Sequence, residues 1–212
     1  SGVLQTSEIS VRQAQKEIVH YAERMHRMFG MTCALIDERD KKEFESQYAR
    51  IEHYENIADN MEIEIANYLE QVGNEHLSDD TKEKTRVMLR QIGELESIGD
   101  ACYKMARTVS HLREHKEDFT AEQYIRLHDM LRLVHEAVAQ MIVVVSGRRN
   151  DLSLADSWAI ERDINELRTQ MRNDTVIAVN SQQYSYALGT LYNDIVADCE
   201  KIGDYVMNIV EA

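Results

Sequence analysis

The sequence of 212 residues contains no proline and only eight glycines. Proline interrupts helices and glycine weakens them, so their scarcity favours long, unbroken helices. No stretch of useful length alternates apolar and polar residues in the way that half-buried strands do. The one β-like patch, residues 142–145, ends a helical pattern. An all-α protein is therefore expected.

Cysteine is also scarce. The sequence has three cysteines, Cys33, Cys102 and Cys199, which is an odd number, and they lie far apart. Two of them fall among apolar helical positions, which excludes a disulfide framework and indicates buried free thiols in a reducing compartment.

Positive charge is in the minority, with 24 Lys and Arg residues against 38 Asp and Glu residues and a net charge of −14. This balance argues against binding to nucleic acid or to anionic lipid, and suits cations or a basic partner surface. No apolar run approaches the roughly 20 residues of a transmembrane helix, so we expect no membrane insertion in this segment. A secretory signal peptide is not evident either.

Apolar residues recur at helical spacing in six segments joined by short polar links. We expect helices over about residues 6–37, 42–72, 78–115, 120–146, 153–180 and 181–212. The expected N-terminal residues are Thr6 or Ser7, Ser78, Thr120, Ser153 and Ser181. Short links make neighbouring helices antiparallel. The third expected helix has an apolar seam of seven residues: Met88, Ile92, Leu95, Gly99, Cys102, Ala106 and Val109.

One motif occurs twice, as Glu96-Ser97-Ile98-Gly99-Asp100 and as Glu200-Lys201-Ile202-Gly203-Asp204. On a helix the two acids of each motif lie on one face, one turn apart, and repel by about 0.2–0.5 kcal/mol. A glycine inside a helix costs about 0.5–1 kcal/mol relative to alanine. Both copies of the motif contain the repelling acids and the destabilising glycine. We therefore expect a cation at the acids and a close helix approach at the glycine.

The two motifs are 104 residues apart, and the same shift without a gap maps Asp59 on Asp163 and Glu62 on Glu166. This internal repeat predicts two tandem three-helix bundles, over residues 1–117 and 118–212. The fold class expected is all-α, with a spectrin-like arrangement of six helices.

The second expected helix carries Glu52, Glu55, Asp59 and Glu62 on one face, and no Lys or Arg occurs between residues 50 and 82 to neutralise them. Carboxylates converging from neighbouring helices are a common metal site in bundles. A solvated face or the charged flank of a coiled coil is the alternative. The second unit has Ala159 where the first has Glu55, so a second site is weaker, differently built or absent.

The repeated motif in a proline-free chain of six helices resembles the PhoU family, whose members are two three-helix bundles with an E/D-x-x-x-D motif in each. The resemblance implies regulation of phosphate uptake and divalent or trivalent metal ions such as iron, zinc or manganese on the acidic faces. Residues 18–25 and 65–69 are more similar to the PhoU-like domain at the cytoplasmic end of bacterial sodium/phosphate cotransporters. Together, the acidic faces and the resemblance give these candidate metal ligands: Glu55, Asp59, Glu62, Glu96, Asp100, Asp163, Glu166, Glu200 and Asp204.

The function expected is that of a non-enzymatic regulatory domain of sodium/phosphate transport, at the cytoplasmic face of the bacterial inner membrane. Its expected partners are a membrane transport domain, on the same chain or a separate one, and a second copy of the chain. One alternative is a free-standing PhoU-type regulator of a phosphate ABC transporter and its sensor kinase.

Two further alternatives belong to other classes. A carboxylate-bridged metalloenzyme needs paired ExxH motifs. Glu23-Arg24-Met25-His26 fits that pattern, but nothing in the expected fourth helix does. A structural coiled-coil module needs no metal, and predicts that replacing Glu96 and Asp100 by alanine stabilises the fold.

Overall fold

A computed structural model describes residues 2–74, 77–147 and 151–212, and it contains six α-helices and no strand in these ranges. The helices are α1 (Gly2–Asp37), α2 (Lys41–Gly73), α3 (Asp79–Glu114), α4 (Ala121–Val145), α5 (Asp151–Asn180) and α6 (Tyr186–Val210). The expected all-α class is confirmed.

Two of the predicted helix starts are confirmed by their hydrogen bonds. The Ser78 hydroxyl accepts from the backbone N–H of Thr81 at 3.2 Å. Thr120 forms a capping box with Gln123, in which each side chain accepts a hydrogen bond from the backbone N–H of the other residue.

The other predicted starts are wrong. Helix α1 already begins at Gly2, and α5 at Asp151. Residues 181–185 form a loop, and Ser185 caps α6 in place of Ser181. Each predicted start was a hydroxyl residue near the beginning of an apolar pattern, and that signal does not fix a helix end to within a few residues.

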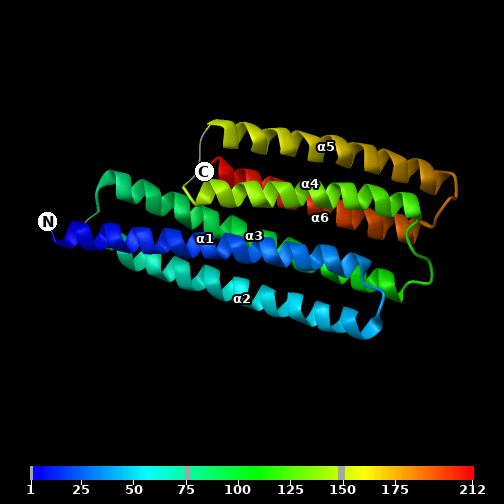
Figure 1. Cartoon of the computed structure of the whole chain (residues 1–212), viewed down its shortest axis with the longest axis horizontal. Helices are drawn as coiled ribbons and strands as arrows, with labels where there is room; N and C mark the ends of the chain where they lie inside the picture. The colour runs from blue at the N-terminus through cyan, green and yellow to red at the C-terminus, as the bar shows by residue number, and fades with distance from the viewer. Residues whose placement is uncertain (1, 75–76, 148–150) are drawn as a thin grey trace.

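The helices lie along the long axis of the molecule in two groups (Figure 1). Helices α1, α2 and α3 pack against one another, and so do α4, α5 and α6. Two further contacts, α3 with α6 and α1 with α4, join the groups side by side. The central pair α3 and α6 therefore carries the two repeated motifs at the junction between the bundles.

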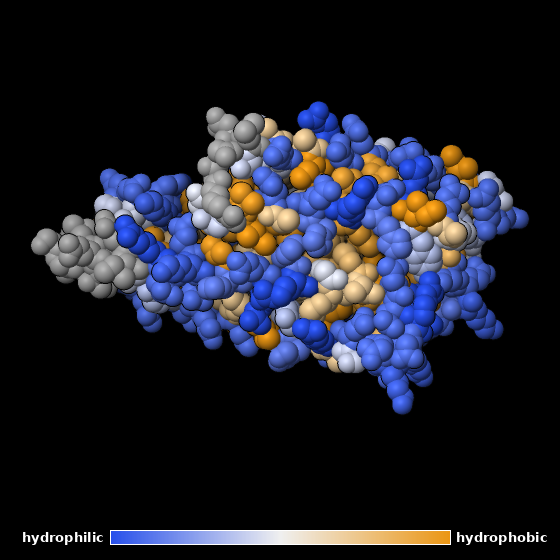
Figure 2. All heavy atoms as spheres, viewed as in Figure 1, coloured by the Kyte–Doolittle hydropathy of each residue, from blue (hydrophilic) through white to orange (hydrophobic). Residues whose placement is uncertain are grey.

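The predicted apolar seam of the third helix is confirmed, because all seven of its residues are buried. These residues are Met88, Ile92, Leu95, Gly99, Cys102, Ala106 and Val109. One continuous core cluster runs through both bundles and includes residues from all six helices. The face in Figure 2 is largely hydrophilic, with apolar side chains scattered among polar ones. Within the described residues, no helix has the length and apolar character needed to cross a membrane.

Candidate functional site

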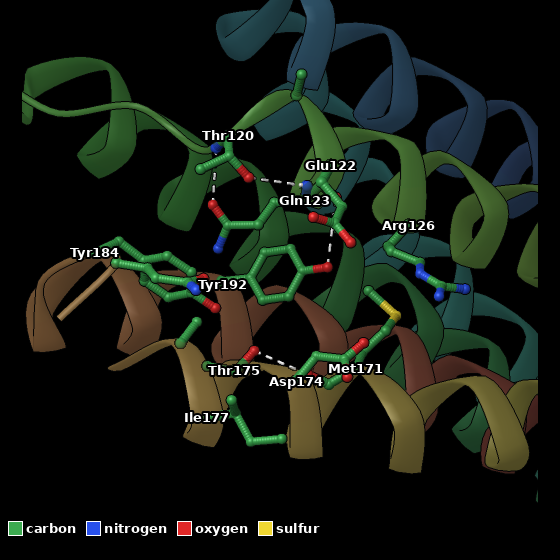
Figure 3. Close-up of a pocket in the computed structure, with 13 residues that line it drawn as sticks. Thr120, Glu122, Gln123, Arg126, Met171, Asp174, Thr175, Ile177, Tyr184 and Tyr192 are labelled. Atoms are coloured by element: carbon green, nitrogen blue, oxygen red, sulfur yellow. Dashed lines mark hydrogen bonds between the residues drawn. The ribbon is translucent and has the colours of Figure 1, made fainter. Parts of the chain in front are cut away.

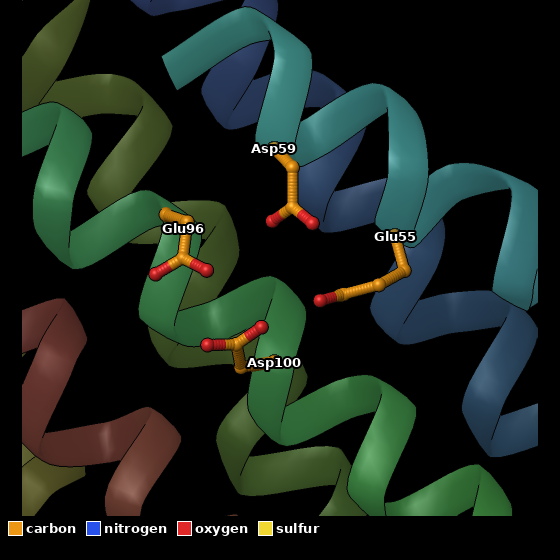
Figure 4. A group of neighbouring side chains, drawn as sticks. All are labelled: Glu55, Asp59, Glu96 and Asp100. Atoms are coloured by element: carbon orange, nitrogen blue, oxygen red, sulfur yellow. The ribbon is translucent and has the colours of Figure 1, made fainter. Parts of the chain in front are cut away.

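Helices α2 and α3 bring four carboxylates together on one face of the first bundle. Glu55 and Asp59 come from consecutive turns of α2, and Glu96 and Asp100 from consecutive turns of α3. One carboxylate oxygen from each residue lies within 4.8 Å of the others. Figure 4 shows the four side chains pointing into the space between the two helices. We call these four residues the α2–α3 acidic cluster.

Gly99 lies on α3 where α1 and α2 both pack against it, beside the cluster. A Cβ atom at this position would lie 3.1 Å from Met25 Sδ, 3.5 Å from Ala58 Cβ and 3.5 Å from Glu55 Oε2. The glycine therefore leaves room chiefly for the Met25 thioether of α1, and the carboxylate of Glu55 lies at ordinary contact distance.

Burial and mutual repulsion favour protonated carboxyls within the cluster. Burial, the adjacent side chain of Asp100 and the other neighbouring acids raise the pKa of Glu55 to about 9. The same three causes raise the pKa of Glu96 to about 8. Glu62, one turn beyond Asp59, has a raised pKa, mainly because of burial and also because of the charges of Asp59 and Asp100. A cation bound among these carboxyls would displace the protons and stabilise the ionised forms.

The α2–α3 acidic cluster has the chemistry of a site for a hard or borderline cation. Glu55 Oε2 is buried and has no hydrogen-bond partner among the described residues. No Lys, Arg or His in the described ranges forms an ion pair with any of the four acids. Converging oxygen ligands with one unpaired buried oxygen fit a di- or trivalent metal ion.

The second bundle builds its acidic face differently. The motif on α6 supplies Glu200 and Asp204, and α5 supplies Glu161, whose Oε2 lies 3.0 Å from where a Cβ of Gly203 would be. Burial and a hydrogen bond with Asp204 raise the pKa of Glu161 to about 7. Glu161 was not among the predicted ligands.

Two arginines neutralise this second face. Arg168 Nη1 forms a short ion pair with Glu200 Oε1, and Arg172 Nη2 lies 3.4 Å from Glu200 Oε2. Both arginines come from α5, so a protein cation occupies the position that the first bundle leaves to acids alone. Among the described residues, the α2–α3 acidic cluster is the one group of three or more His, Cys, Asp or Glu residues whose ligand atoms converge within 4.8 Å.

The gap-free shift of 104 residues is therefore wrong as an alignment of α2 with α5. Ala58 lies beside Gly99 and Ile164 beside Gly203, and these pairs are 41 and 39 residues apart. When the alignment is corrected for this difference of two residues, Glu55 corresponds to Glu161.

With the same correction, Asp59 corresponds to Asn165 and Glu62 to Arg168. Asp163 and Glu166, which the uncorrected shift selected, lie on α5 outside the group of converging acids. Aligning the two helices on their apolar seams, with Ala58 matched to Ile164 and Met61 to Leu167, would have found Glu161 from the sequence.

The fold and this site define a class: a protein of two three-helix bundles with a carboxylate cluster in the first. The family model of the PhoU domain matches residues 127–212. No curated protein sequence matches the chain.

Two solved structures share the fold over nearly the whole chain. One is the phosphate transport system regulatory protein PhoU from Streptococcus pneumoniae, with a TM-score of 0.81 and 15% identity over 97% of this chain and 93% of that one. The other is PhoU from Pseudomonas aeruginosa, with a TM-score of 0.85 and 14% identity over 96% of this chain and 95% of that one.

Proposed function

We propose that this protein is a PhoU-type regulator of phosphate transport and not an enzyme. The observation that carries the proposal is the shared six-helix fold, which covers more than nine tenths of both the chain and the two PhoU structures. The match of residues 127–212 to the PhoU domain supports it independently of the fold.

The free-standing form of this function has better support than the domain of a sodium/phosphate cotransporter. Both structural neighbours are PhoU proteins, and the one from Streptococcus pneumoniae is described as a regulatory protein of a phosphate transport system. The partner proposed is accordingly a phosphate transporter, with the chain at the cytoplasmic face of the membrane.

The α2–α3 acidic cluster is proposed as the metal-dependent part of this regulator. Glu55, Asp59, Glu96 and Asp100 would hold iron, zinc or manganese between α2 and α3, with Glu62 one turn away. A bound cation relieves the repulsion among the acids and fixes the two helices relative to each other. It would supply charge neutralisation and structural rigidity.

A metal-content experiment tests this assignment with a matched control within the same chain. The variant Glu96→Gln/Asp100→Asn neutralises the motif on α3, and Glu200→Gln/Asp204→Asn makes the same exchanges in the motif on α6. Untagged protein is stripped with chelator, reloaded with iron, zinc or manganese in turn, desalted and measured by elemental analysis. We expect the wild type and the α6 variant to retain metal and the α3 variant to lose it.

Equal metal content in the wild type and the α3 variant would overturn the metal site. The coiled-coil alternative predicts instead that the metal-free α3 variant is more stable than the wild type and that neither binds metal.

The regulatory role is tested separately, in the source cells. Deleting the coding sequence should alter the uptake of radioactive phosphate, and re-expressing the chain should restore it. Unchanged uptake in the deletion strain, under both phosphate-rich and phosphate-poor growth, would overturn the role in phosphate transport.

A further inference from the structure

A second candidate site lies in the second bundle, away from the acidic residues described above. It is a cavity of about 450 Å³ between the N-terminal turn of α4, the last turns of α5, the loop before α6, and α6 itself. Figure 3 shows these elements surrounding the cavity. This volume is within the range of small-molecule sites in proteins.

The side-chain amide of Gln123 is the strongest indication of a ligand. Gln123 is only 6% exposed, and its Oε1 accepts a hydrogen bond from the backbone N–H of Thr120 at 2.8 Å. This bond fixes the orientation of the amide. Its Nε2 then has no hydrogen-bond partner among the described residues, and it points away from Thr120 toward the space beside Tyr184 and Tyr192 (Figure 3). A buried donor without a partner is costly, and a ligand acceptor would satisfy it.

Flat apolar surfaces line the cavity around this donor. The hydroxyl of Tyr192 donates to the backbone carbonyl of Gln123 at 3.4 Å, and Phe119 packs edge-on against the Tyr192 ring, with ring centroids 5.2 Å apart. Tyr184, Met171 and Ala178 also line the cavity. Such a lining suits a planar, partly apolar body that carries a hydrogen-bond acceptor.

The rim of the cavity carries two side chains that accept hydrogen bonds and one that donates them. Glu122 and Asp174 present carboxylates, and Arg126 presents a guanidinium group. In the ranges that the structure describes, none of the three forms an ion pair. Carboxylates accept hydrogen bonds from sugar hydroxyls, and a guanidinium beside a helix N-terminus binds phosphate.

From these features we propose that the cavity binds a purine nucleoside 5′-monophosphate. The base lies beside Tyr184 and Tyr192 and accepts a hydrogen bond from Gln123 Nε2. The ribose hydroxyls face Asp174 and Glu122, and the phosphate faces Arg126. The site goes beyond the proposed regulatory function and does not depend on the metal site.

Calorimetric titration with four probes tests the proposal on the full chain. AMP and GMP carry all three parts of the ligand, ribose 5-phosphate lacks the base, and adenosine lacks the phosphate. At least one of the two nucleotides should bind, and more tightly than ribose 5-phosphate, which cannot use Gln123 or the tyrosines. No binding of AMP or GMP, or equal affinity for ribose 5-phosphate, would overturn the proposal.

The variant Gln123→Glu separates ligand binding from helix capping. Glutamate keeps the carboxyl oxygen that accepts from Thr120, and it is a common residue at this position of a capping box, so the fold should be retained. The donor is lost, and the affinity for the nucleotide should fall about tenfold or more.

Arg126→Gln serves as the second variant. This exchange should weaken the binding of AMP and leave the affinity for adenosine unchanged. Arg90→Gln, at an exposed position of α3, is the control. Circular dichroism checks the helix content of each variant. Unchanged nucleotide affinity in folded Gln123→Glu would contradict the assignment of Gln123.

Discussion

Glu55 and Glu96 are half-buried carboxyl groups that lie against other acids, and burial is the largest cause of their raised pKa values. Between the ordinary carboxyl pKa of 4.5 and values of about 8 to 9, the folded protein holds protons that the unfolded chain releases. Folding is therefore linked to proton binding, and stability from these groups is present at low pH and is lost as the pH rises.

The metal-free protein should accordingly melt at a lower temperature as the pH is raised from about 5 to about 9. In Glu55→Gln/Glu96→Gln this dependence should be weaker, because neutral amides cannot lose a proton. Glu64→Gln/Glu70→Gln changes two exposed acids of α2 and serves as the control. Melting temperatures measured with chelator present check the prediction, and identical pH profiles for the wild type and Glu55→Gln/Glu96→Gln would contradict it.

At the second face, single residues place a protein cation where the proposed site of the first bundle has only acids. Asn165 stands where the first bundle has Asp59, and Arg168 stands where it has Glu62 and pairs with Glu200. The exchange Asn165→Asp/Arg168→Glu restores the acids and removes the closer of the two cations that pair with Glu200, which leaves Arg172 at 3.4 Å. We expect about one additional metal ion per chain in this variant.

Elemental analysis after reloading measures the gain. Arg162→Glu, which adds one acid at an exposed position of α5, is the control and should leave the metal content unchanged. A metal content equal to that of the wild type in the folded double variant would show that Arg168 is not what keeps metal from this face.

At the scale of helices, apolar periodicity predicts the elements well because burial selects the seam residues directly. All seven predicted seam residues of α3 are buried. The register between repeated helices, which is the alignment of α2 with α5, is harder to predict. Two fewer residues separate the matching positions of α5 and α6 than separate those of α2 and α3, and this difference leaves the apolar seam of each helix intact. A gap-free shift therefore selected Asp163 and missed Glu161. The partners of long side chains, such as Arg168 with Glu200, depend on this register and could not be predicted before it.

Close helix contacts at glycine give a prediction for α6. A Cβ at Gly189 would lie 2.8 Å from Val179 Cγ2 of α5, which is too short for two carbon atoms. Gly189→Ala should therefore destabilise the protein by about 1–3 kcal/mol. Gly93→Ala on α3 is the matched control, because no atom lies within 4 Å of the place that its Cβ would take, and alanine should stabilise that helix by up to about 1 kcal/mol. Denaturant unfolding measures both, and equal stabilities would contradict the predicted contact.

At the scale of the whole molecule, the two bundles share one core. Helices α3 and α6 pack along the junction, and the buried cysteines Cys102 and Cys199 come from these two helices. Their thiols are fully enclosed, and burial raises the pKa of each well above its usual value. Since the core cluster runs through both bundles, separating them would expose apolar surface on both sides.

The protein should therefore unfold in one cooperative transition, with the thiols at the junction exposed in the same step. Burial raises the pKa of Cys33 to about 12, so this thiol should also be unreactive in the folded protein, because the thiolate is the reacting form. A Cys33→Ser variant leaves only the two cysteines of the junction, and a colorimetric thiol reagent then reports on them alone. Its reaction midpoint in denaturant should coincide with the loss of helical circular dichroism. Reaction of Cys102 or Cys199 before the helices unfold would show instead that the bundles separate as folded units.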